Sequence, residues 1–310
     1  MKIVVVGAGG FVGRPLSARL AADGEAVIPI VRTPRGLRGE RAVQDIGTVD
    51  WRPLLEGAES VVHLAARVHL MRDTASDPLS AFRRDNCEAT LRLAHAAVEA
   101  GVRRFVFVSS IKVNGEVTAA GVPFRSDQTP RPADAYGISK LEAELGLAEI
   151  GARTGLEIVV VRPPLVYGPQ VRGNFASMMR WIERGVPLPF ACAVHNKRSF
   201  IGVDNLTDFL TQALCHPDAP GRPLLVSDGQ DLSTRELLEM LARALGMRAR
   251  LLPVPLGWLR VLARIGGQGP AISRLLGNLQ VDIEETKRRL AWSPPVSAED
   301  GLRRTAVAAS

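Results

Sequence analysis

Short apolar runs alternate with segments of helical spacing through the first half of the chain. Each run is apolar at consecutive positions, as in a strand buried on both faces, and the segments between them carry Leu and Ala at helical intervals. We expect strands at residues 3–6, 26–31, 61–65, 105–108 and 158–161, and helices at 14–23, 78–100 and 135–153. Strands that alternate with helices predict a parallel, doubly wound sheet joined by right-handed crossovers.

The pattern changes after Pro163, where proline, glycine and loop signals become denser. Helical spacing continues at residues 174–184, 204–215, 233–245 and 284–290. Residues 251–281 form an apolar, basic stretch interrupted by Gly and Pro, which predicts a pair of short amphipathic helices over the substrate side. We favour a helical cap or an oligomer contact for this stretch and leave a membrane-surface role open.

A glycine-rich loop joins the first predicted strand to the first predicted helix. It reads Gly7-Ala-Gly-Gly-Phe-Val-Gly13, with a glycine at every third position. In a βαβ unit, such glycines allow a tight turn and a close approach of the backbone to a pyrophosphate, and the helix N-terminus offers free N–H groups to the phosphates. We expect the loop to bind a dinucleotide through Gly7, Gly10, Phe11, Val12 and Gly13.

The end of the second strand indicates which dinucleotide is favoured. A carboxylate there would bind the ribose 2′-hydroxyl, whereas an arginine accommodates the 2′-phosphate of NADP. The strand ends Ile-Val-Arg32-Thr-Pro-Arg35, without an acid. We therefore favour NADP(H), with NAD(H) possible, and place Arg32 on the cofactor and Asp45 and Ile46 near its adenine.

These features predict an α/β fold, in which a Rossmann-like doubly wound parallel sheet is followed by a smaller C-terminal α+β substrate domain. We expect the dinucleotide-binding domain at residues 1–163, with later segments near 200–215 returning to it. Residues 164–310 are expected to form mainly the substrate domain.

Composition narrows the partners only slightly. The 310 residues include 39 Lys and Arg against 32 Asp and Glu, a net charge of +7, which fits an anionic substrate, nucleic acid or a membrane surface. No basic stripe with interleaved aromatics points to nucleic acid, and the spacing of the Cys and His residues predicts neither a disulfide framework nor a metal site. No secretory segment or membrane span is visible, so we expect a cytoplasmic protein.

Three polar residues can meet beside the cofactor. Tyr136 and Lys140 lie four positions apart on one helix face, and Ser110 follows the strand at 105–108. Ligands of open α/β sheets bind outside the carboxyl ends of the strands. Hydride transfer at a carbinol carbon requires a proton to move at its oxygen, and a tyrosine with an ordinary pKa of about 10 needs a nearby cation to act as base. Ser110, Tyr136 and Lys140 are therefore predicted to be catalytic.

Together these motifs resemble those of the extended short-chain dehydrogenase/reductase superfamily, in its nucleotide-sugar epimerase/dehydratase branch, over nearly the whole chain. The matching segments are 7–13, 45–46, 63–66, Asn86 with Thr90, 107–110, 136–140, 162–169, 198–205 and 291–294. The resemblance implies that Ser110, Tyr136 and Lys140 are catalytic. It also implies that the cofactor is lined by Leu64, Ala65, Ala66 and Pro163. The nucleotide sugar is expected to contact Asn174 and Arg198, and we add Lys112 to these.

The chain departs from the 4,6-dehydratases of this branch after Ser110. Those enzymes carry an Asp-Glu pair there, which they use to eliminate water, and this chain has Ile111-Lys112. A dehydratase is therefore not expected. Asn114 replaces a usual aromatic residue, which indicates a different pocket shape.

We expect a nucleotide-sugar oxidoreductase that transfers hydride at C4 of a UDP-sugar, as a 4-ketoreductase or 4-dehydrogenase. Residues 195–200 and 226–233 resemble segments of reductases that complete UDP-N-acetylquinovosamine for bacterial surface polysaccharide. A UDP-sugar 4-epimerase with tightly bound NAD is the alternative, and a non-catalytic NADP-sensing binding protein is the alternative of another class. The family resemblance also implies a homodimer.

Overall fold

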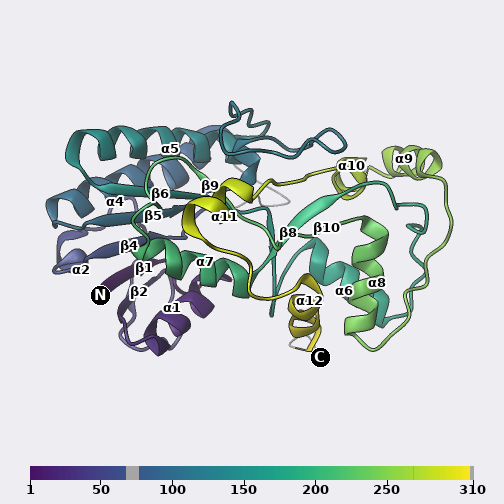
Figure 1. The fold of residues 1–310 in the computed structure, drawn as a ribbon, viewed down its shortest axis with the longest axis horizontal. Coiled ribbons are helices and arrows are strands. Elements are labelled where there is room, and N and C mark those ends of the chain that lie inside the picture. The colour runs from purple at the N-terminus through teal and green to yellow at the C-terminus, as the bar shows by residue number, and fades with distance from the viewer. Residues whose placement is uncertain (68–76, 268, 308–310) are drawn as a thin grey trace.

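The computed structural model describes residues 1–67, 77–267 and 269–307. Within these residues, seven parallel strands form the main sheet in the order β3-β2-β1-β4-β5-β6-β9 (Figure 1). The strands are β1 (Lys2–Val6), β2 (Ala26–Val31), β3 (Arg41–Ala42), β4 (Ser60–His63), β5 (Arg104–Val108), β6 (Glu157–Arg162) and β9 (Leu224–Leu225). The order reverses on either side of β1, so the predicted doubly wound parallel sheet is confirmed.

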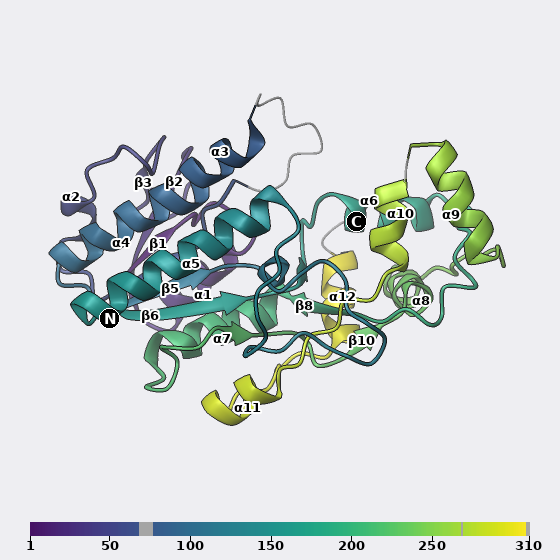
Figure 2. The same cartoon turned by 90° about the horizontal axis from the view of Figure 1, so that it is seen from above.

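Helices cover both faces of this sheet. Alternate residues of β1 point to opposite sides: Ile3 and Val5 pack in one apolar core, and Val4 and Val6 in the other. The first core is closed by α1 (Gly13–Ala22), α7 (Val203–Cys215) and α11 (Glu284–Leu290), and the second by α2 (Arg52–Leu55), α4 (Ala89–Glu99) and α5 (Ala135–Thr154). Figure 2 shows α4 and α5 side by side over one face.

The helix expected at 78–100 is not a single α-helix. It consists of α3 (Pro78–Phe82), the π-helical turn η1 (Arg83–Glu88) and α4. The wider turn places Asn86, which is fully buried, between two other segments. Its side-chain amide donates to the Arg67 carbonyl at 3.0 Å and to the Ser139 hydroxyl at 3.1 Å, and its oxygen accepts from the Arg67 N–H at 2.7 Å. A π-turn of this kind often marks a functional site.

A second, smaller sheet lies beyond the carboxyl end of β6. Its strands have the order β10-β8-β7, and helices pack around it over a separate apolar core (Figure 1). These elements are β7 (Leu165–Tyr167), β8 (Arg198–Gly202), β10 (Asp231–Leu232), α6 (Asn174–Glu183), α8 (Thr234–Ala244), α9 (Leu256–Ile265), α10 (Gly269–Leu276) and α12 (Ala298–Val307). The two short helices expected within 251–281 are thus α9 and α10.

The chain passes between the two sheets more than once. After β8, helix α7 returns to pack on α1, and β9 adds to the edge of β6. The domain boundary expected at residue 163 stays a prediction. In the described part of the chain, no helix is long and apolar enough to cross a membrane.

Candidate active site

The glycine loop after β1 has a geometry that side chains would prevent. Gly7 has φ +90°, and a Cβ there would lie 2.8 Å from the backbone nitrogen of Ala65. At Gly13, a Cβ would lie 2.2 Å from the Gly7 carbonyl oxygen, so this glycine lets α1 pack closely on β1. A Cβ at Gly10 would meet only that same carbonyl, at 3.1 Å, and Gly10 is exposed. The loop therefore presents open backbone where a pyrophosphate would approach.

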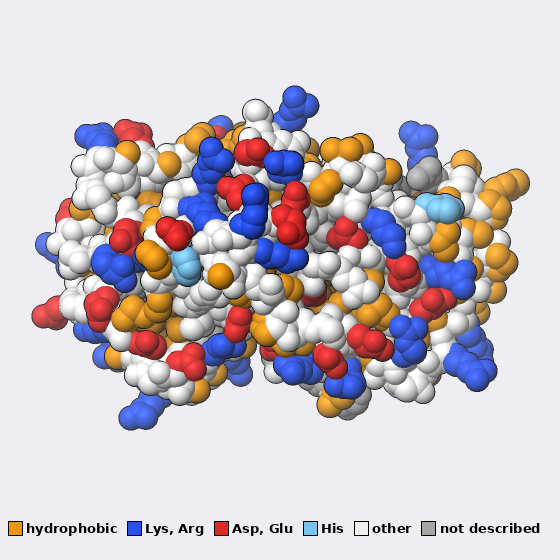
Figure 3. Space-filling model, viewed as in Figure 1, with side chains coloured by type: hydrophobic (Ala, Val, Ile, Leu, Met, Phe, Trp, Pro, Cys, Tyr) orange, Lys and Arg blue, Asp and Glu red, His pale blue; other side chains and the backbone are white. Residues whose placement is uncertain are grey.

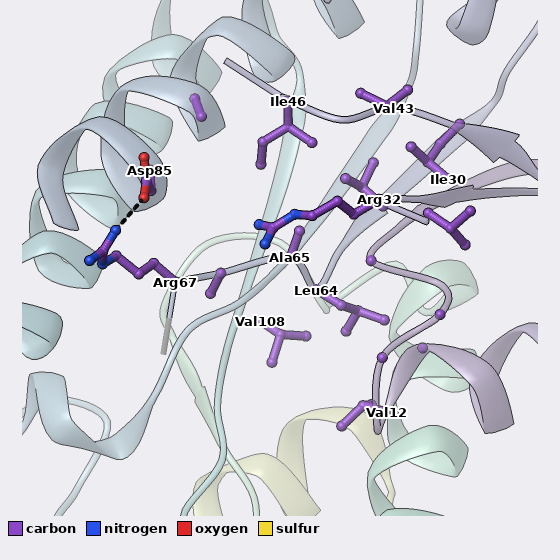
Figure 4. Close-up of a pocket in the computed structure, with 18 of the residues that line it drawn as sticks. Val12, Ile30, Arg32, Val43, Ile46, Leu64, Ala65, Arg67, Asp85 and Val108 are labelled. Carbon is purple, nitrogen blue, oxygen red and sulfur yellow. Dashed lines mark hydrogen bonds and ion pairs between the residues drawn. The ribbon is translucent and has the colours of Figure 1, made fainter. Parts of the chain in front are cut away.

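A cleft of about 1170 Å³ runs from this loop along the carboxyl ends of the strands (Figure 4). Its volume suits a ligand as large as a dinucleotide, because pockets for drug-sized molecules span about 300–1,000 Å³. All predicted cofactor residues line it: Gly7, Gly10, Phe11, Val12, Gly13, Arg32, Asp45, Ile46, Leu64, Ala65, Ala66, Tyr136, Lys140 and Pro163. Ser110 lines the same cleft. The open glycine cradle and this lining fit a nicotinamide dinucleotide.

The segment after β2 brings positive charge to the cleft. Figure 4 shows the Arg32 side chain extending from the end of β2 toward Ile46 and Ala65. The following turn is closed by Glu40, whose carboxylate accepts backbone N–H bonds from Arg35, Gly36 and Leu37 at 3.0–3.1 Å. Desolvation opposes ionisation of Glu40, but these hydrogen bonds prevail and lower its pKa. The turn therefore holds a carboxylate of its own close to Arg35.

Ser110, Tyr136 and Lys140 meet where the cleft passes the end of β5. Asp134 caps α5 through the Gly137 N–H at 2.7 Å, which starts the helix so that Tyr136 and Lys140 share its first turns. Burial, followed by the nearby Asp134 carboxylate, raises the pKa of Tyr136 to about 12, and a hydrogen bond with Ser110 opposes the shift. The arrangement can hold or release a proton at the Tyr136 hydroxyl when a cation assists.

Lys140 lies beneath the tyrosine in an apolar environment. Its ammonium donates to the Val108 carbonyl at 3.0 Å and lies 4.4 Å from the centre of the Phe107 ring. Burial lowers the pKa of Lys140 to about 7, and Glu144 opposes that shift. Burial, with a smaller contribution from Lys140, also lowers the pKa of His63 to about 3, so this histidine stays neutral near pH 7.

A buried ion pair lies one helical turn beyond Lys140. Arg162 contacts both carboxylate oxygens of Glu144 through Nε, at 3.0 and 3.2 Å, and donates through Nη1 to Asn114 at 2.9 Å. Ser109 also donates to Glu144. Asn114, which stands where an aromatic residue is usual, is therefore a hydrogen-bond acceptor for Arg162.

Lys112, predicted to contact substrate, does not line the cleft. Its ammonium forms ion pairs with Asp134, the cap of the catalytic helix, and with Glu116 at 3.3 Å. Lys112 thus lies beside the carboxylate that, after burial, raises the pKa of Tyr136, and its predicted contact with substrate stays a prediction.

Asn174 and Arg198, the other two predicted substrate residues, also lie outside the cleft lining. Asn174 is exposed at the first position of α6. Arg198, in β8, donates to the Arg274 carbonyl at 2.6 Å and to the Gly277 carbonyl at 3.3 Å, so the end of α10 holds its guanidinium. Burial, followed by the charge of Arg274, lowers the pKa of Arg198 to about 10. Their predicted roles stay predictions.

Sequence reasoning missed a polar group on the far wall of the cleft. Arg67 forms an ion pair with Asp85 at 3.2 Å (Figure 4), and its guanidinium carbon lies 5.6 Å from the centre of the Phe82 ring. Phe82 in turn meets Tyr136 edge-on at 6.1 Å. The only signal in the sequence was the position of Arg67 directly after the 63–66 segment.

Comparison with known proteins identifies the family. The sequence profile of the NAD dependent epimerase/dehydratase family matches residues 3–226. A Vibrio cholerae protein named UDP-glucose 4-epimerase is 39% identical over 311 residues, with 99% of this chain and 95% of that protein covered. The GDP-6-deoxy-D-mannose reductase of Pseudomonas aeruginosa is 30% identical over 249 residues, with 78% and 79% covered.

Solved structures share the fold of this chain. The crystal structure of UDP-glucuronic acid 4-epimerase from Bacillus cereus in complex with NAD matches with a TM-score of 0.80 at 22% identity, and covers 100% of this chain and 96% of that one. The chain belongs to the NAD dependent epimerase/dehydratase family. It is an enzyme of the extended short-chain dehydrogenase/reductase type, and the predicted nucleotide-sugar epimerase/dehydratase branch is confirmed.

Proposed function

We propose that the chain transfers hydride at C4 of a UDP-sugar and acts as a 4-epimerase, which removes and returns hydride at the same carbon. The observation that carries this proposal is the meeting of Ser110, Tyr136 and Lys140 at one point of the dinucleotide cleft. The Vibrio cholerae relative, 39% identical over 99% of this chain, supports the choice of substrate and reaction.

Three side chains handle the proton in this proposal. Tyr136 takes the proton from the sugar O4 as C4 is oxidised and returns it on reduction. Because its pKa is about 12, the tyrosinate needs positive charge nearby, and Lys140 supplies it from the next turn of α5. Ser110 donates a hydrogen bond to the same sugar oxygen and orients it. A nicotinamide bound beside these residues would supply the hydride acceptor and donor at C4, and return of the hydride to the opposite face of the turned 4-keto sugar would give the epimer.

A 4-ketoreductase is the second candidate, and Arg32 is the observation that favours it. The end of β2 offers a guanidinium and no carboxylate to the cleft, which fits the 2′-phosphate of NADP(H). A reductase releases oxidised cofactor after each turnover and binds reduced cofactor again, which NADPH can supply. The relationship to a GDP-6-deoxy-D-mannose reductase is compatible with this reading.

Incubation with UDP-glucose, UDP-N-acetylglucosamine and their 4-keto derivatives, while the absorbance of reduced nicotinamide is followed, separates the candidates. An epimerase yields the C4 epimer with no net change in reduced cofactor. A reductase consumes one reduced cofactor for each 4-keto sugar. Cofactor binding without turnover of any of these sugars would favour a sensor protein and reject both enzymatic proposals.

Tyr136→Phe should reduce turnover by about 10²–10⁴-fold, because it removes the group that moves the proton. Cofactor binding, measured by fluorescence titration, should change little. Tyr167→Phe is the matched control, since Tyr167 lies in the smaller core, bonded to Asp228 at 2.7 Å, and does not line the cleft. Unchanged turnover of Tyr136→Phe would reject the mechanism.

A further inference from the structure

Helix α9 carries two apolar stripes, and only one of them is buried. Leu259 and Ala263 are 7% and 8% exposed, on the side that faces the smaller core. The second stripe lies at helical intervals of three, four and seven residues and is open to water: Trp258 is 70% exposed, Val261 55%, Leu262 57% and Ile265 80%. A soluble helix normally turns polar residues outward, so four large apolar side chains on one face indicate a binding surface.

The surrounding chain is strongly basic. Residues 240–281 contain six arginines and no Asp, Glu or Lys, which gives a net charge of +6 over this segment. Arg248 and Arg264 are exposed, and among the described residues no carboxylate lies within 4.0 Å of either guanidinium. Figure 3 shows hydrophobic side chains gathered at the end of the molecule where Figure 1 places α9, with Lys and Arg side chains beside them.

The stripe lies at an end of the molecule that the remaining described chain does not cover. Both ribbon views place α9 at the end opposite the main sheet (Figures 1 and 2), and its main neighbour is α10. Leu252, in the strand-like segment before the helix, is also 47% exposed. A partner can therefore approach the stripe without rearranging the cleft.

We propose that α9 docks this molecule on an anionic lipid bilayer, with the Trp258–Ile265 stripe in the headgroup region and the exposed Arg248 and Arg264 on the lipid phosphates. A ten-residue helix is too short to span a bilayer, but an apolar face flanked by Arg lies well in its interface. Trp is favoured there because its ring is amphipathic. This inference does not depend on the proposed reaction.

Charge decides between a lipid surface and a second copy of the chain. A two-fold contact would place the same patch against itself, so it would bring together two segments that each carry six arginines and no carboxylate of their own, of which Arg243 lies 4.0 Å from Glu299 of α12. An anionic bilayer supplies the opposite charge, and each arginine near its surface contributes about 1 kcal/mol, a factor of roughly five in binding.

Co-sedimentation of the full chain with vesicles tests the proposal. We expect binding to phosphatidylcholine vesicles that contain phosphatidylglycerol, little binding to phosphatidylcholine alone, and a loss of binding as salt is raised. The fluorescence of Trp258 should shift to the blue on binding, and Trp258→Phe should keep binding but lose most of the shift.

Substitutions separate the two contributions. Arg248→Glu with Arg264→Glu should weaken binding about 25-fold or more, from roughly fivefold for each arginine removed. Trp258→Ser with Ile265→Ser should weaken it at least about tenfold, because the apolar anchor is lost. Leu145→Ser is the matched control, as Leu145 is 63% exposed on α5, far along the chain from α9.

Three results would overturn the proposal. One is the absence of binding to anionic vesicles at low salt by folded protein. Another is a dimer in solution that Trp258→Ser with Ile265→Ser converts to monomer, because the stripe would then be covered by a second copy. Equal loss of binding in the Leu145→Ser control would also reject it.

Discussion

Glu144→Gln tests whether the buried ion pair beyond Lys140 stabilises the fold. Glu144 lies one turn after Lys140 in α5, and Arg162 is the last residue of β6. Their side chains are only 6% and 3% exposed. The substitution keeps the shape of the side chain and removes its charge, so the Arg162 guanidinium stays buried without a compensating carboxylate.

The size of the effect follows from the contacts. Removal of one partner of a buried pair costs about 3–5 kcal/mol, since the other charge is left desolvated. The Arg162 Nε contacts both carboxylate oxygens, at 3.0 and 3.2 Å, and an amide keeps only one of them as an acceptor. Asn114 still accepts from Nη1 at 2.9 Å. We therefore expect a loss near the lower end, about 3 kcal/mol of the free energy of unfolding.

Urea titration, followed by far-ultraviolet circular dichroism, measures this loss as a lower midpoint at an unchanged slope. Glu149→Gln is the control: it breaks the Glu149–Arg153 pair on the same helix, whose side chains are 70% and 77% exposed. That surface pair should be worth about 0.3–0.5 kcal/mol. A cost below about 1 kcal/mol for Glu144→Gln, or equal costs for the two substitutions, would refute the importance of burial for this pair.

Three further substitutions probe the cleft and the residues beside it. Arg32→Glu should lower the ratio of NADPH affinity to NADH affinity by about tenfold or more, since a charge-assisted hydrogen bond contributes roughly 1.5–3 kcal/mol. Arg38 is exposed on the same turn and lies outside the cleft, so Arg38→Glu should leave this ratio unchanged. An unchanged ratio in Arg32→Glu would contradict the placement of the 2′-phosphate beside Arg32. Asp134→Asn keeps an N-cap oxygen but removes the charge that, after burial, raises the pKa of Tyr136, so the rise of activity with pH should move to lower pH. Lys112→Met should move it to higher pH, and movement of both variants in the same direction would contradict this electrostatic coupling.

The main sheet could be predicted because its strands are apolar on both faces. β1, β2 and β5 lie within a residue or so of their expected positions, and the helices between them follow from Leu and Ala spacing. β3, β9 and β10 have only two residues each, too few for any periodicity, and β9 and β10 pair with strands far from them along the chain. The π-turn at 83–88 was missed because it lies inside a continuous helix, and no Gly or Pro within it marks a change of structure.

The residues that line the cleft were easier to predict than the residues that surround them. The glycine loop and the carboxyl ends of parallel strands determine where a dinucleotide fits, and all expected cofactor residues line that place. Lys112 shows the limit of such reasoning. The contact with substrate predicted for it stays a prediction, whereas its ion pair with Asp134, 22 residues later, follows from no local pattern in the sequence.

Part of the net charge of +7 lies in the cleft, as a comparison of the ion-pair partners of its cationic side chains shows. In the described part of the chain, the cleft-lining Arg67 and Arg84 have ion pairs with Asp85. Four other cations line the same cleft, and among the described residues no ion pair with a carboxylate is found for any of them: Arg32, Arg35, Arg92 and Lys140. Unneutralised cations in a cleft attract anions. The cleft therefore gathers positive charge in one place, whereas the total charge alone allowed nucleic acid or a membrane equally.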